Sequence, residues 1–209
     1  MSGVNWVLDE RRFLSLGEVR RLLSTARKRK EEAEPRGRKV PVRDYFIVDL
    51  ALSTGLRVQE IASLKCGDLL IDNGMSSVVV RNGKCGKTRV VRFGRAFLGR
   101  VLDYLDWKRR AGERVSPEAP LIFSSVRKDH TTTRGIQKAF KRCAARAGLR
   151  RGCSIHSLRH TYACHLYRAS NYNLRLVQKQ LGHSTVRTTE VYADVMNPDL
   201  TRALERLYV

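Results

Sequence analysis

The chain has 209 residues, enough for one good core with small appendages, and its hydrophobic fraction of 42% is ordinary for a globular protein. It contains no run of about 18 apolar residues and no apolar signal region at the start, so neither a membrane span nor secretion is expected. Five cysteines, an odd number without paired short spacings, are typical of reduced thiols in the cytosol. The sequence therefore predicts a cytoplasmic globular protein.

The charge is strongly one-sided. Lys and Arg number 41 against 20 Asp and Glu, which gives a formal net charge of +21. Acidic residues are absent from 73 to 102 and again from 130 to 189, whereas a merely soluble surface intersperses both signs. Such segments favour a continuous surface for a phosphate backbone. Charge alone leaves open a basic solvated surface or an RNA-associated protein.

The first third of the chain predicts helices separated by a loop. Ser15 and Glu18 have capping-box spacing and precede apolar residues at helical intervals. Gly55 follows a strongly apolar run and is suited to end a helix. The expected elements are a helix over 15–30, a loop over 30–41, a helix over 43–55 and a short helix over 57–64.

The middle of the chain predicts a β-hairpin. "SSVVV" and "TRVVRF" are β-branched runs on either side of the Gly-rich "NGKCGK". "LIFSS" (121–125) predicts another short strand. Amphipathic or apolar patterns predict helices over 95–111, 132–147, 156–169, 173–181, 185–195 and 199–207. The expected fold class is mainly α with a small antiparallel β-sheet (α+β).

Two helical motifs carry residues suited to chemistry. In "TGLRVQEIASL", Arg57 could form an ordinary exposed pair with Glu60, or present its planar guanidinium to a phosphate from a helix start. In "SIHSLRHTYACHL", His156, Arg159 and His160 share one face of a helix and could bind one anion.

A metal site is the rival interpretation of the second motif. Cys153, His156, His160 and Cys164 have C-x2-H-x3-H-x3-C spacing. However, Cys153 precedes the helix and Arg159 would repel a cation. A structural His160, hydrogen-bonded within the core, is favoured over a zinc ligand.

Two further features are ambiguous when taken alone. Lys84 and Lys87 lie at the Gly-containing hairpin tip, where lysines are usually just solvated, although the acid-free surroundings allow them to reach toward DNA. In "LGHSTVRTTEVYADV", Tyr192 follows His183 by nine residues and is either a packing residue or a nucleophile.

These motifs, in this order, resemble the tyrosine recombinase (phage integrase) family, and are close to its Xer-like and integrase members. The resemblance runs from about residue 15 to 197 through "TGLRVQEIASL", "GKCGKTRVV", "HSLRHTYACHL", "LGH" and the tyrosine nine residues on. It implies the tyrosine recombinase catalytic-domain fold. The implied division is an N-terminal lead-in over 1–14, the catalytic domain over 15–197 and a C-terminal helix over 198–209, which either is exchanged between protomers or folds back on its own chain.

The resemblance assigns roles to six residues and answers the question about Tyr192 in favour of chemistry. One arginine clamps the scissile phosphate, the tyrosine attacks it, a hairpin lysine protonates the leaving 5′-oxygen, and the second histidine donates to a non-bridging oxygen. The catalytic positions are Arg57, Lys84, His156 (a proton carrier), Arg159, His183 and Tyr192. Candidate DNA contacts are Lys87, Arg89, Arg134, Lys138, Arg142 and Arg187, and Glu60 and His160 are expected to give structural support.

The implied chemistry is DNA cleavage and rejoining through a covalent 3′-phosphotyrosine. It needs no ATP, no metal and no other cofactor, because the ester stores the bond energy and fixed cations stabilise the transition state. Expected partners are double-stranded DNA and further copies of the chain, as a dimer or tetramer on DNA and a monomer when free; no membrane partner and a nucleoid-associated place in the cytoplasm are expected.

Three alternatives stay open. A type IB topoisomerase-like activity uses the same chemistry, an accessory DNA-binding protein keeps the fold without turnover, and a zinc-dependent regulator is the least favoured. Relatives usually carry an N-terminal DNA-clamping domain, whereas here the resemblance starts almost at Met1, so the chain is either a catalytic fragment or a single-domain recombinase.

Overall fold

The computed structural model describes residues 13–71, 76–81, 88–183, 189, 190 and 192. The α-helices with defined bounds in this part of the chain are α1 (Leu16–Ala33), α2 (Lys39–Thr54), α3 (Val58–Ser63), α4 (Arg95–Arg110), α5 (Thr133–Arg146), α6 (Ile155–Ala169) and α7 (Leu174–Leu181). Short 3₁₀ turns are η2 (Glu34–Arg36) and η3 (Cys66–Asp68), and the strands are β1 (Leu69–Leu70), β2 (Ser77–Val80), β3 (Arg89–Arg92), β4 (Phe123–Ser124) and β5 (Asp129–His130).

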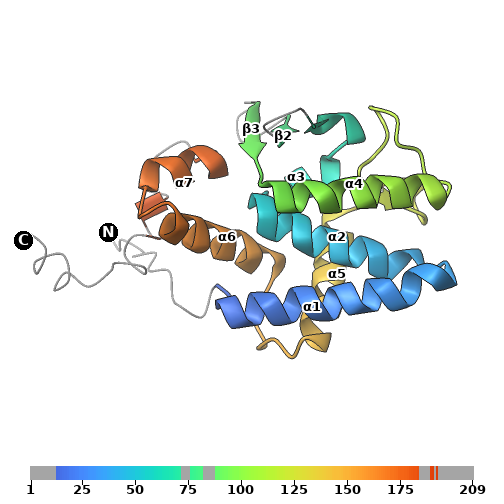
Figure 1. The fold of residues 1–209 in the computed structure, drawn as a ribbon, viewed down its shortest axis with the longest axis horizontal. Helices are drawn as coiled ribbons and strands as arrows, with labels where there is room; N and C mark the ends of the chain where they lie inside the picture. The colour runs from blue at the N-terminus through green and yellow to red at the C-terminus, as the bar shows by residue number, and fades with distance from the viewer. Residues whose placement is uncertain (1–12, 72–75, 82–87, 184–188, 191, 193–209) are drawn as a thin grey trace, which may run out of the picture.

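The long helices α1, α2, α4 and α5 form the main body, and α6 and α7 lie at one end of it (Figure 1). Strands β1, β2 and β3 form one antiparallel sheet in that order, beside the N-terminal end of α4, and β4 pairs with β5. The predicted mainly α fold with a small antiparallel sheet is therefore confirmed. No helix in the described part of the chain is long and apolar enough to cross a membrane.

Helix α1 begins as the sequence predicted but ends later. Ser15 Oγ accepts from Glu18 N at 3.2 Å, and Glu18 Oε2 accepts from Ser15 N at 2.8 Å, so the capping box is formed. The loop predicted over 30–41 was mostly wrong. Pro35 lies in the first turn of η2, where its missing N–H is not needed, and Gly37 at φ 66° turns the chain directly into α2.

Helix α2 is the centre of the core, with every residue from 41 to 51 buried. Phe46 stacks on Tyr104 of α4 with ring centroids 3.6 Å apart and an interplanar angle of 4°. The helix ends at Gly55 with φ 63°, as predicted for a C-terminal cap. The left-handed residue turns the chain, so that Arg57 lies at the start of α3.

The predicted hairpin is confirmed, with Val78 paired to Val91 and Val80 to Arg89. Its tip, residues 82–87, lies outside the described part of the chain. Strand β1 was not predicted, because two residues are too short for an alternating pattern. It pairs with β2 through Leu69 and Val78.

The later elements follow the prediction within a few residues, with two exceptions. The strand expected over 121–125 is reduced to β4, and its partner β5 was not predicted. Of the helix expected over 185–195, only Thr189, Glu190 and Tyr192 are described, and all three are helical. The helix expected over 199–207 lies outside the described residues.

Buried apolar side chains form two clusters. The larger one runs through the main body and reaches the first turn of α6. The smaller one joins the rest of α6 to α7 and includes Ala163, Cys164, Tyr167, Val177, Leu181 and Tyr192. The start of α3, strand β3, helix α6 and the end of α7 lie together where these two clusters meet, and they carry several of the residues singled out from the sequence.

Candidate active site

The first component of the site is Arg57 at the N-terminus of α3. Its backbone N donates to Glu60 Oε2 at 2.8 Å, and its Nη1 donates to Glu60 Oε1 at 2.9 Å. The Arg57 side chain is 30% exposed, whereas Glu60 is only 6% exposed. The pair is therefore not the ordinary exposed pair that the sequence alone allowed.

A second arginine, Arg89 of β3, holds the same carboxylate. Its Nη1 and Nη2 donate to the two oxygens of Glu60, each at 2.8 Å. Burial raises the pKa of Glu60, but the hydrogen bonds and charges of Arg89 and Arg57 outweigh it and lower the pKa to about 2. Glu60 is therefore an ionised carboxylate shared between two guanidinium groups.

Arg159 of α6 is almost completely buried, with 7% exposed. Its Nη1 donates to the carbonyl oxygen of Gly55 at 2.5 Å, and its Nη2 donates to that of Leu181 at 2.9 Å. Burial, together with the positive charge of Arg57, lowers its pKa to about 10, so the group stays charged at neutral pH. Arg159 thus ties the end of α2 to the end of α7 and keeps a cation inside the site.

His183 follows Gly182, the left-handed residue that ends α7. Its Nε2 lies 3.1 Å from Arg159 Nη2, and its Nδ1 lies 3.0 Å from Thr189 Oγ1. Burial and then the charges of Arg159 and Arg57 lower the pKa of His183 to about 3, so the ring is neutral at neutral pH. Because arginine only donates, Nε2 must accept and Nδ1 carries the proton. Donation to a phosphate oxygen, the expected role, would require a proton on Nε2.

Tyr192 lies in the smaller apolar cluster with 2% of its surface exposed. Its hydroxyl is 3.1 Å from His160 Nδ1. Burial raises the pKa of Tyr192 to about 12, although the charges of Arg159 and Arg57 act in the opposite direction. His156, the expected proton carrier, lies one turn earlier on α6 and is exposed. In this structure it is His160, expected to be structural, that contacts the phenol.

The zinc interpretation gains no support. In the described part of the chain, no three His, Cys, Asp or Glu side chains converge as metal ligands. Cys164 is fully buried, and burial raises the pKa of its thiol to about 12, whereas zinc binds a thiolate.

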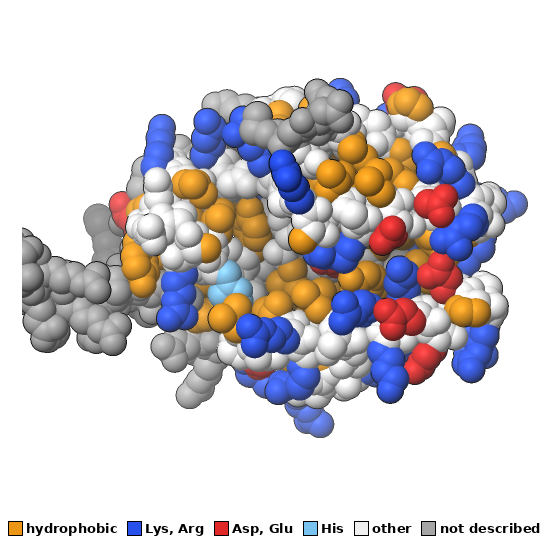
Figure 2. Space-filling model, viewed as in Figure 1, with side chains coloured by type: hydrophobic (Ala, Val, Ile, Leu, Met, Phe, Trp, Pro, Cys, Tyr) orange, Lys and Arg blue, Asp and Glu red, His pale blue; other side chains and the backbone are white. Residues whose placement is uncertain are grey.

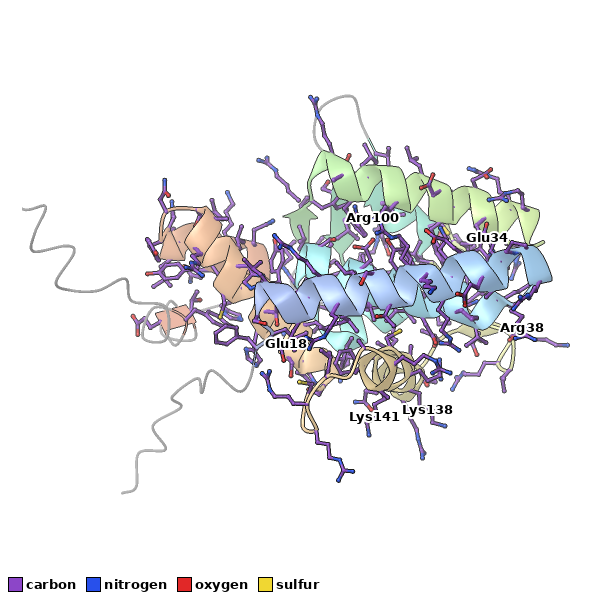
Figure 3. All side chains as sticks on the ribbon, turned by 60° about the horizontal axis from the view of Figure 1, so that its bottom comes forward. Glu18, Glu34, Arg38, Arg100, Lys138 and Lys141 are labelled. Atoms are coloured by element: carbon purple, nitrogen blue, oxygen red, sulfur yellow. The ribbon has the colours of Figure 1, made fainter. Side chains whose placement is uncertain are left out.

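The candidate DNA contacts differ in their surroundings. Arg134 and Lys138 are exposed on α5, and Figure 3 shows Lys138 and Lys141 extending outward from the same side of that helix. Arg142 instead donates to both oxygens of the buried Asp44, at 2.8 and 2.6 Å. Arg89 is bound to Glu60 as described above. Lys84, Lys87 and Arg187 lie outside the described residues.

The face shown in Figure 2 is unevenly charged. Most of its acidic side chains gather over the half formed by α1 and α4. Lys and Arg predominate over the other half, toward α6 and α7. This distribution follows from the acid-free segments of the sequence.

Sequence reasoning missed the contacts that join β3 to α7. The side-chain amide of Gln180 donates to Arg92 O at 2.9 Å and its Oε1 accepts from Arg92 N at 3.2 Å, so it pairs with the strand as a backbone segment would. Gln180 also donates to Tyr162 Oη at 3.1 Å. These partners are far apart in the chain, so no local sequence pattern predicts the contacts between them. The contact between Thr189 and His183, by contrast, joins residues six apart within one short motif, so the sequence places the two side chains near each other.

The fold is that of tyrosine recombinase catalytic domains. The XerH site-specific recombinase bound to difH substrate in a pre-cleavage complex has a TM-score of 0.74 and 26% identity, over 94% of this chain and 54% of that chain. The crystal structure of XerA recombinase gives 0.69 and 27%, over 92% and 63%. The catalytic domain of bacteriophage HP1 integrase, 21% identical, has a TM-score of 0.60 over 93% of this chain and 94% of that chain.

The sequence pattern of the phage integrase family matches residues 12–197, and the chain belongs to this family. It is 35% identical over 193 residues to tyrosine recombinase XerA of Thermococcus kodakarensis, which covers 92% of this chain and 61% of the relative. It is 30% identical over 184 residues to tyrosine recombinase XerD of Listeria monocytogenes, covering 88% and 58%. The chain therefore spans about three fifths of the length of these relatives.

Proposed function

We propose that this chain is the catalytic domain of a site-specific DNA recombinase that cuts and rejoins strands through a 3′-phosphotyrosine, in DNA integration, excision or resolution. The observation that carries the proposal is that Arg159 contacts His183 at 3.1 Å and that the charges of Arg57 and Arg159 act on both His183 and Tyr192. These residues come from the start of α3, from α6, from the turn after α7 and from the segment beyond it. Two cations and a neutral imidazole beside a phenol suit an in-line attack on a phosphodiester.

The arginines supply the electrostatic part of this chemistry. In the proposed step the Tyr192 oxygen bonds to phosphorus and the 5′-oxygen of the next nucleotide leaves with a proton, for which Lys84 is the candidate donor. Arg57 and Arg159 spread positive charge over the phosphoryl oxygens, which gain negative charge in the transition state. The reverse attack by a 5′-hydroxyl rejoins the strand and restores the phenol.

The buried phenol is in a resting arrangement. A tyrosine with a pKa of about 12 and a hydroxyl in contact with His160 is a poor nucleophile at neutral pH. Attack therefore requires the phenol to approach a phosphate bound at the arginines, where positive charge favours the phenolate. His160 is then well placed to receive the phenol proton, a role we expected for His156.

The partners in this proposal are double-stranded DNA and other copies of the same chain. The exposed lysines of α5, together with Lys87, would contact the phosphate backbone, and the similar XerH structures contain bound difH substrate. We also propose the division into 1–14, 15–197 and 198–209 given above, with the last segment exchanged between protomers, and a nucleoid-associated place in the cytoplasm.

The test is a covalent trapping experiment. The protein would be incubated without metal or ATP with nicked duplexes that have a randomised centre, and adducts surviving denaturation would be recovered and sequenced. We expect an EDTA-resistant adduct for the native protein and for Tyr172→Phe, an exposed tyrosine outside the site, and none for Tyr192→Phe. DNA binding without an adduct, persisting after an N-terminal DNA-clamping domain is joined to the chain, would instead indicate an accessory DNA-binding protein.

A further inference from the structure

We propose that Arg89 does not contact DNA but is a positioning residue. It keeps the charge of Arg57 available for the scissile phosphate and fixes the positions of Arg57 and His183 relative to each other. The inference rests on the proposed function for its catalytic consequence. Its structural basis is the pair of contacts that Arg89 makes, one with Glu60 and one with Gly182.

The guanidinium of Arg89 faces into the protein. Its two terminal nitrogens donate to both oxygens of Glu60 at 2.8 Å, and its side chain is only 15% exposed. Its Nε is buried and has no hydrogen-bond partner in the described part of the chain. A group whose donors are turned inward in this way is poorly placed to bind a DNA phosphate. Arg57, which shares the carboxylate, is twice as exposed, at 30%.

The charges explain why two arginines share one carboxylate. Arg57 alone with Glu60 would be a neutral pair, and its attraction for a phosphate would be largely cancelled. Arg89 adds a second positive charge on the inner side of the carboxylate, so the three groups together keep one net positive charge. Since Arg89 is fixed by two hydrogen bonds, that charge costs no rearrangement when a phosphate arrives.

The stem of Arg89 also fixes the turn that carries His183. A β-carbon built on Gly182 would lie 2.4 Å from Arg89 Cδ and 2.6 Å from Nε, so the backbone of the turn lies directly against this side chain. Gly182 immediately precedes His183. A second contact between α7 and β3 is made by Gln180, whose side-chain amide forms hydrogen bonds with the backbone of Arg92. Strand β3 thus sets the position of α7 while its first residue holds the carboxylate that orients Arg57.

Arg89 also acts on the protonation of His183. The charged or titratable groups that lower the pKa of His183 are Arg159 and His160 of α6, Arg57 at the start of α3, and Arg89 of β3. Removal of the Arg89 charge should therefore raise the pKa of His183. This change can be observed in the free protein, without DNA.

The test compares Arg89→Met, Arg89→Lys and the double variant Glu60→Gln/Arg89→Met, with Arg92→Met as an exposed control on the same strand. For Arg89→Met we expect an unchanged salt dependence of DNA binding, together with adduct formation at saturating DNA reduced about 100-fold, as when one preorganised charge is removed from a transition state. Arg89→Lys should regain part of the rate, because it keeps the charge but loses the paired hydrogen bonds. The double variant should also regain part, because Arg57 is no longer neutralised.

Titration of His183 by NMR in the free protein gives a second readout. Its pKa should rise in Arg89→Met and stay unchanged in Arg92→Met. A fall of about one in the slope of log Kobs against log salt, with full cleavage at saturating DNA, would identify Arg89 as a phosphate contact and overturn the proposal. An unmoved His183 pKa would also overturn it.

Failure of the proposed function would look different. The native protein would then form no adduct. The His183 titration would still decide the role of Arg89, as would the coupling free energy between Glu60 and Arg89, obtained by comparing the unfolding of the two single variants with that of the double variant. If Arg89→Met does not fold, the same two measurements can be made on Arg89→Lys, for which we expect smaller changes in the same direction.

Discussion

Replacing Gly182 with alanine should damage the site far more than the same change at another left-handed glycine. Gly182 has φ +65°, and an added methyl group would come within 2.4 Å of Arg89 Cδ. That atom belongs to a side chain whose far end is held by two hydrogen bonds to Glu60, so it cannot move aside without breaking them. Gly37 is the matched control, because its φ is +66° and nothing lies within 4 Å of the position its β-carbon would take.

The two costs can be separated. A left-handed conformation costs an alanine about 1–2 kcal/mol, and this applies to both variants. Overpacking adds about 1–3 kcal/mol at Gly182 alone. We therefore expect the free energy of unfolding to fall by about 1–2 kcal/mol in Gly37→Ala and by about 2–5 kcal/mol in Gly182→Ala. At roughly 2–4 °C per kcal/mol for a domain of this size, the control should lose about 2–8 °C in Tm.

Urea unfolding and adduct formation would both be measured. In Gly182→Ala the adduct should form slowly even at temperatures where the protein is fully folded, because Arg89 and His183 are displaced. Gly37→Ala should cleave at the native rate. If the two variants lose the same stability and cleave equally fast, the close contact between Gly182 and Arg89 has no functional consequence and the reasoning is wrong.

Three further predictions concern stability and DNA binding. The folded pKa of His183 is about 3, below the ordinary 6.5, so its contribution to stability is complete above pH 6.5 and is lost as the pH falls toward 3. In His183→Gln the Tm should therefore depend less on pH between 6.5 and 3 than in the native protein, and an identical pH dependence would contradict this. Lys108, fully buried, donates to Glu113 at 3.1 Å, and the same carboxylate also pairs with the buried Arg43. Lys108→Met should therefore cost only about 1–3 kcal/mol in urea unfolding, whereas Glu113→Gln, which leaves both cations without their carboxylate, should cost about 3–5 kcal/mol; a larger loss in Lys108→Met than in Glu113→Gln would contradict this. Lys138→Ala should lower the salt slope of DNA binding by about 0.9, whereas Arg142→Met should instead lower the free energy of unfolding, and equal slope changes would show that both residues contact DNA.

The fold could be predicted from local signals wherever an element is long enough to show them. The capping box at Ser15, the left-handed Gly55 and the β-branched hairpin each placed an element correctly. Strands β1, β4 and β5 have two residues each, too few for any periodicity, and were missed or only partly found. The loop predicted over 30–41 was wrong because Pro and Gly there shape a tight turn between helices rather than a longer connection.

The site could be predicted by residue type but not by contact. The order of motifs pointed to six candidate catalytic positions, yet it could not show which histidine of α6 meets the phenol. His156 and His160 share a face of α6, and the choice depends on where Tyr192 lies in the folded chain. The sequence also could not show that Arg142 and Arg89 are bound to carboxylates within the protein, since these partners lie 98 and 29 residues away in the sequence.

The hydrogen bond between Arg159 and His183 predicts a link between DNA binding and proton uptake. A phosphate that takes a donor of Arg159 leaves His183 Nε2 facing an anion, which it can contact favourably only with a proton on that nitrogen. The negative charge should also raise the pKa of His183 from its value of about 3 in the free protein.

Binding at pH 6 should therefore take up protons, and calorimetry in buffers of different ionisation enthalpy would measure the number. His183→Gln should reduce the uptake, and Tyr192→Phe should leave it largely intact because the phenol is not the group that changes charge on binding. An uptake of zero in the native protein would show that His183 meets the phosphate by a change of tautomer. In that case its neutral ring, kept uncharged by burial and by the charges of Arg159, Arg57 and Arg89, is the form that acts.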